Sequence, residues 1–440
     1  MSESWNEAAL DPAEMGFVGE RRVSVVVVGG GQAGLSMSWH LKKAGIDHVV
    51  FERKRCFSEW RQARWDSFCL VTPNWQCRLP GFRYDHEYGG TDSQGFMLKD
   101  QIVDYLDAYR ASFDPPVLEG VEVRSVRPTR QGHFHVRTSA GDYLAGQVVI
   151  ANGVYSEPII PRSAERLPDE ILQLHSSSYR NPESLQDGAT LVVGSGQSGC
   201  QIAEDLHIAG RDVHLCVGSA PRSPRVYRGR EVTDWLTDSG YYDIPIDQHP
   251  QGEAVRHKTN HYLTGRDGGR EIDLRQRAVE GMKLYGSFAD VHGGHLHFKP
   301  DLSRNLDRAD ASYNGIRTLV DQYIRQAGIE APVEPPYTPP WAPSQDVLEL
   351  DYMAAGIRNI VWAIGFVPDY AWAELPVFSG QGRPLHQRGV SAMPGVYFLG
   401  LSWQNTWGSG RFADVGKDAE YLLGFIQRHV AARSPRLQAA

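Results

Sequence analysis

Apolar and polar positions alternate in blocks along this chain, and the order of the blocks predicts an α/β protein. Residues 23–55 have the pattern of a strand, a glycine turn, a helix and a second strand. A helical stretch follows over residues 98–113, and residues 117–150 contain strands with period-two alternation. A second strand, turn, helix and strand occupy residues 189–226. Strands that alternate with helices in this way are typical of parallel sheets.

The same order predicts that one such domain is inserted in another. The first block ends in a buried strand, and Pro158 and Pro161 behind it are typical of a linker that leaves the domain. Residues 228–330 are rich in polar, charged and glycine residues, so we interpret them as an elaboration of the second domain. Apolar runs return from about residue 345 and would complete the first sheet. The predicted boundaries are 1–155 and 341–440 for the outer domain and 156–340 for the inserted one.

Two glycine-rich turns of the form GxGxxG lie about 165 residues apart, and each directly follows an apolar, β-branched run. In a dinucleotide-binding turn the first glycine permits the tight turn, the second lets the backbone approach a pyrophosphate, and the third lets helix and strand pack closely. The N-terminus of the following helix offers N–H groups to the phosphates. Two such turns predict two bound nucleotides. Their residues are Gly29, Gly31, Gln32, Ala33 and Gly34 in the first turn, and Gly194, Ser195, Gly196, Gln197, Ser198 and Gly199 in the second.

The residues beyond each turn indicate which nucleotide it binds. Glu52 ends the strand after the first turn, where a carboxylate can accept hydrogen bonds from ribose hydroxyls, as in FAD or NAD binding. No acid ends the corresponding strand after the second turn, and Arg222 and Arg225 follow it instead. Arginine suits a ribose 2′-phosphate, so the second turn favours NADPH. The alternative is that both arginines are solvated loop residues.

Composition and charge exclude several other classes of protein. The chain has 440 residues and a formal net charge of −8, so it lacks a global basic field for nucleic acid or an anionic membrane. Its longest apolar runs are strand-sized, and its acidic, polar N-terminus has no hydrophobic signal region. We therefore expect no signal peptide and no membrane span, and a cytoplasmic location. Nothing in the sequence indicates the oligomeric state.

The five cysteines bear on a competing function. They are odd in number and scattered, without CxxC or metal-ligand spacing, so we expect neither a structural disulfide nor a bound metal. A disulfide reductase with two nucleotide turns needs a redox-active cysteine pair close in sequence. Only Cys69 and Cys77, eight residues apart, could form an unorthodox pair.

Four motifs in this order resemble the class B flavoprotein monooxygenases, which are single-component FAD and NADPH enzymes. Two are the glycine turns with Glu52 and with the arginines, and two are ATG-like strand ends at Ala151-Asn152-Gly153 and Ala363-Ile364-Gly365. The resemblance runs from about residue 22 to 430, except for residues 228–330. It implies FAD at the first turn, NADPH at the second, and oxygenation of a small-molecule substrate by O2 through a C4a-(hydro)peroxyflavin.

The resemblance also assigns residues around the flavin. Trp60 and Arg61 are similar to a tryptophan–arginine pair beside the isoalloxazine, and Asn74 is similar to a catalytic asparagine but lies about three residues out of register. The alternative for Asn74 is an ordinary turn residue after a proline. The loop and helix N-terminus from Gly408 to Phe412 would approach the flavin pyrimidine ring. Glycines at the ends of strands or loops complete the cofactor-binding set: Gly153, Gly365, Gly400 and Gly408.

The string from His175 to Tyr179 is similar to the HSSxY of N-hydroxylating members, which indicates an amine as the oxygen acceptor. The alternative is that His175 and Tyr179 brace the linker between the domains. Two other functions stay open: an FAD-dependent NADPH dehydrogenase or oxidase without oxygen insertion, and a non-catalytic FAD protein that senses NADPH. Because the cofactor supplies the reactive oxygen, we nominate neither a catalytic triad nor a metal.

Overall fold

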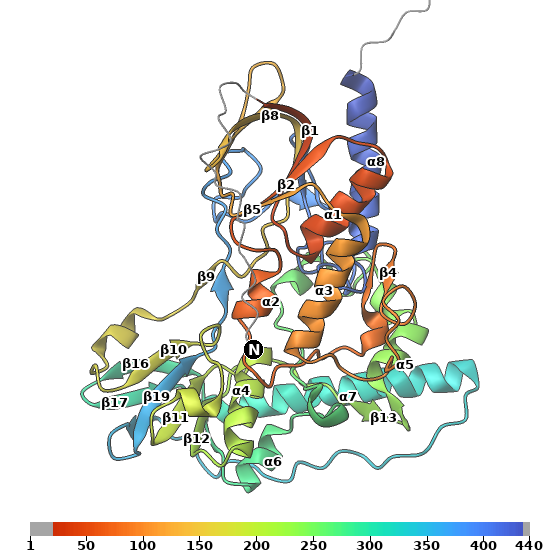
Figure 1. Ribbon diagram of the computed structural model, residues 1–440. Helices are drawn as coiled ribbons and strands as arrows, with labels where there is room; N and C mark the ends of the chain where they lie inside the picture. Colours follow the sequence, from red (N-terminus) through yellow and green to blue (C-terminus); the bar gives the residue numbers. More distant parts are fainter. Residues whose placement is uncertain (1–20, 434–440) are drawn as a thin grey trace, which may run out of the picture.

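The computed structural model describes residues 21–433, which form two α/β units joined by two crossings of the chain (Figure 1). The first unit contains residues 21–156 and 368–433, and the second contains residues 157–367. Where the chain crosses between the units, β9 (Glu157–Pro158) pairs antiparallel with β20 (Phe366–Val367). The second unit is therefore inserted in the first.

The first unit is built on a large sheet with a parallel centre. Its strands are β21 (His386–Gln387), β22 (Val390–Ser391), β23 (Val396–Phe398), β8 (Gly141–Ile150), β1 (Arg21–Val28), β2 (His48–Glu52) and β5 (Val117–Glu119), in that order across the sheet. A hairpin of β6 (Val123–Pro128) and β7 (Phe134–Thr138) continues antiparallel from β8. From β23 to β5 every neighbouring pair is parallel.

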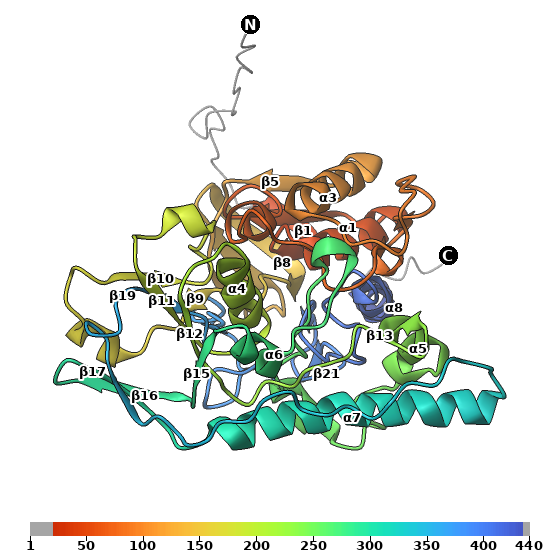
Figure 2. The ribbon, with the colours of Figure 1, turned by 90° about the horizontal axis from the view of Figure 1, so that it is seen from below.

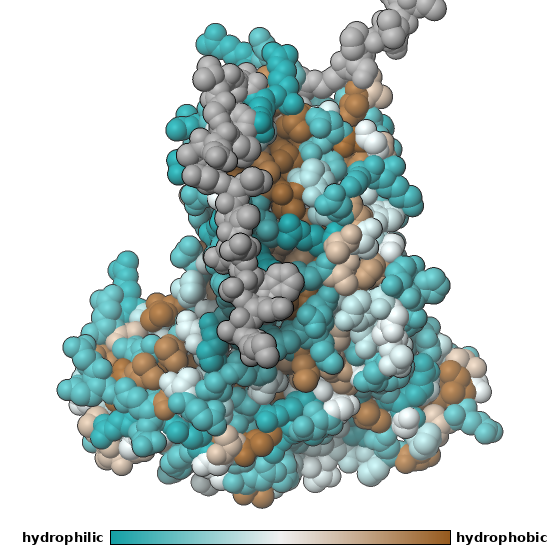
Figure 3. All heavy atoms as spheres, viewed as in Figure 1, coloured by the Kyte–Doolittle hydropathy of each residue, from teal (hydrophilic) through white to brown (hydrophobic). Residues whose placement is uncertain are grey.

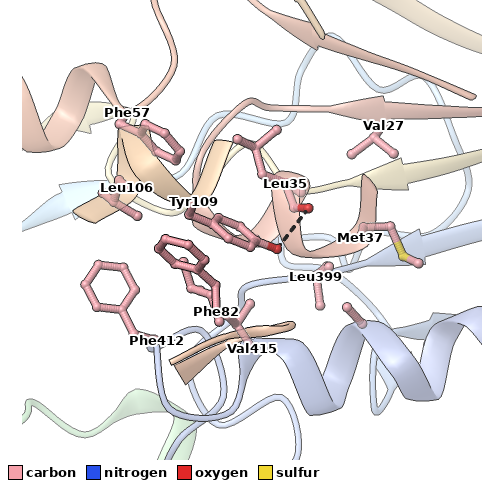
Figure 4. Packing of buried hydrophobic residues seen from close by; sticks show 14 of the residues in the cluster. Val27, Leu35, Met37, Phe57, Phe82, Leu106, Tyr109, Leu399, Phe412 and Val415 are labelled. Carbon is pink, nitrogen blue, oxygen red and sulfur yellow. Dashed lines mark hydrogen bonds between the residues drawn. The ribbon is translucent and has the colours of Figure 1, made fainter. Parts of the chain in front are cut away.

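Residues of β1 explain why this central strand is valine-rich rather than alternating. Val25 and Val27 face a core cluster with the helices, and Val26 and Val28 face a second cluster beneath the β6–β7 hairpin. A strand that is buried on both faces needs an apolar side chain at every position. Figure 4 shows the helical side of this core, where Tyr109 donates a hydrogen bond to the carbonyl of Leu35.

Three helices cover that face of the first sheet: α1 (Gln32–Lys43), α3 (Lys99–Phe113) and α8 (Val415–Arg433) (Figure 1). The short α2 (Ser58–Gln62) and a 3₁₀ turn (Asn74–Gln76) lie in the aromatic-rich stretch between β2 and α3. That stretch continues through a small hairpin of β3 (Arg78–Leu79) and β4 (Phe82–Arg83).

The second unit contains a smaller sheet in which all neighbouring strands are parallel. Its order is β10 (Leu172–His175), β19 (Ile357–Trp362), β11 (Ala189–Val193), β12 (Val213–Cys216) and β15 (Lys283–Tyr285). One face packs against α4 (Gln197–Ile208) and α7 (Leu302–Ala327). The other is covered by a three-stranded antiparallel sheet of β16 (Phe288–His292), β17 (His295–Phe298) and β18 (Glu349–Asp351).

The predicted elaboration supplies the elements at the base of the molecule. Figure 2 shows α7 as one long helix across this face, with α6 (Leu274–Val279) beside it. A separate small cluster joins α5 (Val232–Asp238) to the second half of α7, next to the hairpin of β13 (Val226–Tyr227) and β14 (Arg230–Glu231).

One boundary predicted from the sequence needs correction. Residues from 341 onward were expected to return to the first sheet, but β19 lies between β10 and β11 in the middle of the second sheet. Only β21 to β23 and α8 rejoin the first unit. An apolar run fits either sheet equally well, so the sequence pattern alone does not choose between them.

Of the helices in the described part of the chain, none is at once long enough and apolar enough to cross a bilayer. On the face shown in Figure 3, hydrophobic residues lie scattered among hydrophilic ones.

Candidate functional site

The two glycine turns have nearly the same geometry. Each lies between the first strand of its unit and a helix, β1 and α1 in the first, β11 and α4 in the second. A methyl group on Gly29 would lie 2.4 Å from the carbonyl oxygen of Ala151, and one on Gly194 would lie 2.6 Å from that of Ala363. Each ATG-like strand end therefore packs directly beneath the first glycine of one turn.

The third glycine of each turn is also required by packing. A Cβ on Gly34 would lie 1.8 Å from the carbonyl oxygen of Gly29, and one on Gly199 would lie 1.8 Å from that of Gly194. The absence of a side chain at these positions lets each helix pack close to its strand, as in a dinucleotide-binding turn.

The middle glycines differ, because packing among the described residues does not require them. Within residues 21–433, a Cβ on Gly31 would meet no atom within 4 Å, and one on Gly196 would meet only the Thr259 methyl at 3.6 Å, an ordinary contact. Both residues have extended backbone with negative φ. Each is the N-cap of its helix without a side-chain cap, and neither helix has an acid in its first turn. Open space before uncapped N–H groups fits a phosphate of a bound dinucleotide.

A cavity of about 560 Å³ opens above the first turn and reaches the loop before α8. Gln32 connects its parts: its side-chain oxygen accepts a hydrogen bond from the Trp60 indole at 3.2 Å, and its amide nitrogen donates to the Gly410 carbonyl at 3.4 Å. The Trp60 ring lies 5.3 Å from that of Phe412. The turn, the aromatic-rich stretch and the C-terminal loop thus form one wall.

Many residues predicted to bind the cofactor of the first turn line this cavity. They are Gly29, Gly31, Gln32, Ala33, Glu52, Trp60, Gly153 and Gly400. The carboxylate of Glu52 accepts hydrogen bonds from the backbone N–H groups of Gly30 at 2.8 Å and Lys54 at 2.9 Å. A carboxylate has about four acceptor positions, so this arrangement leaves capacity for ribose hydroxyls.

Four predicted residues lie outside the cavity lining: Gly34, which packs helix against strand, and Arg61, Asn74 and Gly408. Arg61 pairs with Asp107 and also donates to the Cys56 carbonyl. Asn74 is buried, its amide donates to the Asp92 carbonyl at 2.9 Å, and its oxygen accepts from the N–H of Met97 at 2.7 Å. Its side chain is therefore used to hold a loop, which corrects the catalytic assignment.

Gly408 is likewise structural, because a Cβ there would lie 2.1 Å from a carboxylate oxygen of Asp414. Of the loop predicted to approach the flavin, Ser409, Gly410 and Arg411 line the cavity.

A second cavity of about 690 Å³ runs from the second turn to the C-terminal loop of the first unit. Gln197 and Ser219 line it at one end, and Trp403 and Trp407 line it at the other. The Trp407 ring stacks on Tyr242 with centroids 3.8 Å apart. Trp403 adopts φ +51°, a left-handed conformation that is strained for a bulky residue.

Asn260 and Arg411 line both cavities. The Arg411 guanidinium donates to the Asn260 side-chain oxygen at 2.7 Å and lies 4.3 Å from the Trp407 ring centroid. This pair therefore marks the junction of the two cavities. Asn260 was not identified from the sequence, because it lies in the elaboration, where we found no motif.

At the second turn, the side chains serve mainly to connect neighbouring segments. Ser195 accepts a hydrogen bond from the N–H of Gly218 at 2.9 Å, which ties the turn to the end of β12. Gln197 and Gln201 both donate to the Leu263 carbonyl. Of the predicted residues here, Gln197 lines the cavity. The others lie outside the described lining: Gly194, Ser195, Gly196, Ser198, Gly199 and Gly365.

The structure does not agree with the assignment of Arg222 and Arg225 to a phosphate, nor with solvated loop residues. The side chain of Arg222 is 2% exposed and pairs with Asp273 at 3.0 Å and Asp310 at 3.1 Å. The side chain of Arg225 is 3% exposed and pairs with Glu231 at 2.8 Å. Both guanidinium groups are neutralised inside the protein. Their partners lie 6 to 88 residues away, so local sequence gave no sign of them.

His175 and Tyr179 lie outside both cavity linings. His175 donates through Nε2 to the Gly365 carbonyl at 3.1 Å, and Tyr179 donates to a carboxylate oxygen of Asp205 at 2.7 Å. Both side chains are buried. This geometry fits the interpretation that both residues brace the linker between the domains.

The five cysteines are all free and buried. Burial raises the pKa of the Cys69 and Cys77 thiols, so both are protonated at neutral pH. A dithiol that reduces disulfides requires an accessible thiolate. The structure therefore disfavours a disulfide-reductase function.

Buried histidines predict how stability responds to acid. Burial lowers the pKa of His214, His261 and His386 from 6.5 to about 4. Between pH 6.5 and 4 the unfolded chain therefore binds more protons at these sites, and the free energy of unfolding should fall on acidification. Asp418 opposes this, because burial raises its pKa to about 6. Burial also raises the pKa of four other carboxyl groups, and it lowers the pKa of four further histidines. Thermal unfolding midpoints measured across this pH range should decrease toward pH 4.

A His386→Asn variant provides the control. His386 Nδ1 accepts a hydrogen bond from the Gly389 N–H at 3.0 Å, and an asparagine oxygen can take its place. The variant should lose stability less steeply on acidification. If the thermal midpoint of the variant fell with pH as steeply as that of wild type, His386 would not contribute to the loss of stability in acid.

Comparisons with known proteins agree with this arrangement. A family model described as pyridine nucleotide-disulphide oxidoreductase matches residues 26–238. A CzcO-like oxidoreductase of Geobacillus kaustophilus (strain HTA426) is 33% identical over 410 residues, which cover 92% of this chain and 99% of that protein. The flavin-containing monooxygenase of Stenotrophomonas maltophilia has a similar fold, with a TM-score of 0.62, 18% identity, and coverage of 94% of this chain and 100% of that one.

An ornithine N-hydroxylase of Kutzneria sp. 744, solved with reduced FAD, NADP⁺ and L-ornithine, has a TM-score of 0.59 and 18% identity. The match covers 93% of this chain and 100% of that one.

Proposed function

Because this chain belongs to the CzcO-like oxidoreductases and has the fold of the class B flavoprotein monooxygenases, we propose that it is an FAD-dependent monooxygenase that uses NADPH and O2 to oxygenate a small organic molecule. The observation that carries the proposal is the pair of middle glycines, Gly31 and Gly196. In both turns the described part of the chain leaves open space before an uncapped helix N-terminus, although packing within that part does not require glycine there.

We assign FAD to the first cavity. Gly31 and the N-terminus of α1 would hold its pyrophosphate, and Glu52 would accept hydrogen bonds from its ribose. Trp60 and Phe412 form an aromatic wall beside Gln32, which limits access of water. When bound, the flavin supplies the redox chemistry, because it accepts a hydride from NADPH and, once reduced, reacts with O2.

We assign NADPH and the organic substrate to the second cavity. The turn at Gly196 would hold the NADPH pyrophosphate, and the cavity extends from there to the junction at Asn260 and Arg411. Trp403, Trp407 and Tyr242 give the junction end an aromatic lining that suits an apolar substrate. No contact of His175 or Tyr179 favours an amine over other acceptors.

Two measurements test the proposal in sequence. NADPH mixed with the flavin-loaded protein under argon should bleach the flavin absorbance at about 450 nm. Turnover under ¹⁸O2 with a panel of amines, thioethers and ketones should then place label in one product. Bleaching without label, and with stoichiometric peroxide, would indicate a dehydrogenase or oxidase instead. Failure to bleach would leave only a binding function.

A further inference from the structure

With Arg222 and Arg225 buried, another group must meet the ribose end of the coenzyme at the second turn. In this fold the residues just after the second strand of the βαβ unit face the adenosine ribose. Here those residues are Gly218 and Ser219 after β12, and Ser219 lines the second cavity. No acid stands at this point, where an NAD-binding unit would present one to the ribose 2′-hydroxyl.

Helix α7 brings an arginine to the same place. Asn305 donates a hydrogen bond to the Val217 carbonyl at 2.9 Å, which fixes this part of α7 beside the end of β12. Arg308 lies three residues further along the helix, on a neighbouring position of the same face. Arg308 and Ser312 line the second cavity with Ser219. An arginine about 110 residues beyond the second turn therefore lies near Ser219, at the ribose end of the site.

The charge of Arg308 is available to a ligand. Among the described residues no carboxylate forms an ion pair with it, and its neighbour Asp307 is already paired with Arg275 at 2.6 Å. Glu231 supplies the carboxylate in the described lining of the cavity, and Arg225 neutralises it at 2.8 Å. The other cations of the lining lie elsewhere: Lys258 is next to Thr259 above Gly196, and Arg411 is at the junction.

We propose that Arg308 and Ser219 bind the 2′-phosphate of NADPH and so select it over NADH. The inference rests on the proposed function, and it assigns coenzyme selection to a helix outside the βαβ unit. The guanidinium supplies charge and paired donors, and the Ser219 hydroxyl and backbone N–H supply further donors.

The experiment measures binding of coenzyme fragments by calorimetry to the FAD-loaded protein, so it does not depend on turnover. The probes are 2′,5′-ADP, which carries the 2′-phosphate, and 5′-ADP, which lacks it. Wild type should bind 2′,5′-ADP at least about tenfold more tightly than 5′-ADP, because one charge-assisted hydrogen bond to the 2′-phosphate contributes this much affinity. Arg308→Ala should remove most of the preference, and Arg308→Lys should retain part of it, because lysine keeps the charge but loses the planar fork.

Arg304→Ala is the matched control. Arg304 lies one turn earlier on α7, its side chain is 64% exposed, and it pairs with Asp301 rather than lining the cavity. Its replacement should leave both affinities unchanged. If Arg308→Ala keeps the full preference, or if wild type shows none, the inference is wrong. If NADPH still bleaches the flavin in either case, the proposed function survives that failure.

Discussion

Replacing Gly31 by valine should give a folded protein that purifies without flavin. Gly31 has φ −81° in extended backbone, and a Cβ there meets no atom of the described residues within 4 Å, so the variant fold should be unstrained. The new side chain would fill the space through which a pyrophosphate approaches the N–H groups of α1. Losing even one charge-assisted hydrogen bond of roughly 1.5–3 kcal/mol weakens binding by about tenfold or more. Flavin content per chain and the thermal midpoint of apoprotein measure the two effects separately.

Gly196→Val is the matched variant at the second turn. It should keep its flavin but bind NADPH at least about tenfold more weakly, since the same kind of contact is blocked. The pair of variants thus separates the two sites, each losing one coenzyme and retaining the other. A Gly31→Val protein that stays yellow would contradict the assignment of FAD to the first cavity, and a Gly196→Val protein with normal NADPH affinity would contradict the second assignment.

The sequence predicts the parts of this molecule whose determinants are local. Each glycine turn carries its strand, its turn and its helix within about 25 residues, and the structure places both as expected. The two-domain α/β architecture is confirmed. Glu52 and Gly400 line the first cavity because strand ends of a parallel sheet meet at one edge, and Trp60 lines it from α2, which follows β2 in the chain.

What the sequence does not predict depends on contacts between distant segments. Asn260 and Arg308, both from the elaboration, come together with Arg411 of the C-terminal loop around the second cavity. No spacing in the chain relates them. The same limit explains the domain boundary, since β19 pairs on its two sides with β10 and β11, which lie about 170 to 190 residues earlier in the chain.

Contacts with distant residues change the interpretation of Arg222 from a phosphate ligand to a partner in a buried ion pair. This ion pair gives the second large expected effect. Replacing Arg222 by methionine should destabilise the second unit by about 3–5 kcal/mol, the usual cost of removing one partner of a buried ion pair. Asp273 and Asp310 would both lose the positive charge of Arg222, although Arg275 still pairs with Asp310 at 2.8 Å. The Arg222 guanidinium also lies 4.2 Å from the Tyr313 ring centroid, and that contact would be lost as well.

A loss of this size should lower the thermal midpoint of the second unit by roughly 6–20 °C for a unit of about 200 residues. The Arg304→Ala protein provides the comparison, because an exposed pair contributes about 0–1 kcal/mol. The preference for 2′,5′-ADP over 5′-ADP should persist in Arg222→Met at a temperature where it is folded. A stable Arg222→Met protein that had lost this preference would indicate that Arg222 binds the 2′-phosphate. A guanidinium that only holds Asp273 and Asp310 in place would not change the difference in affinity between the two probes.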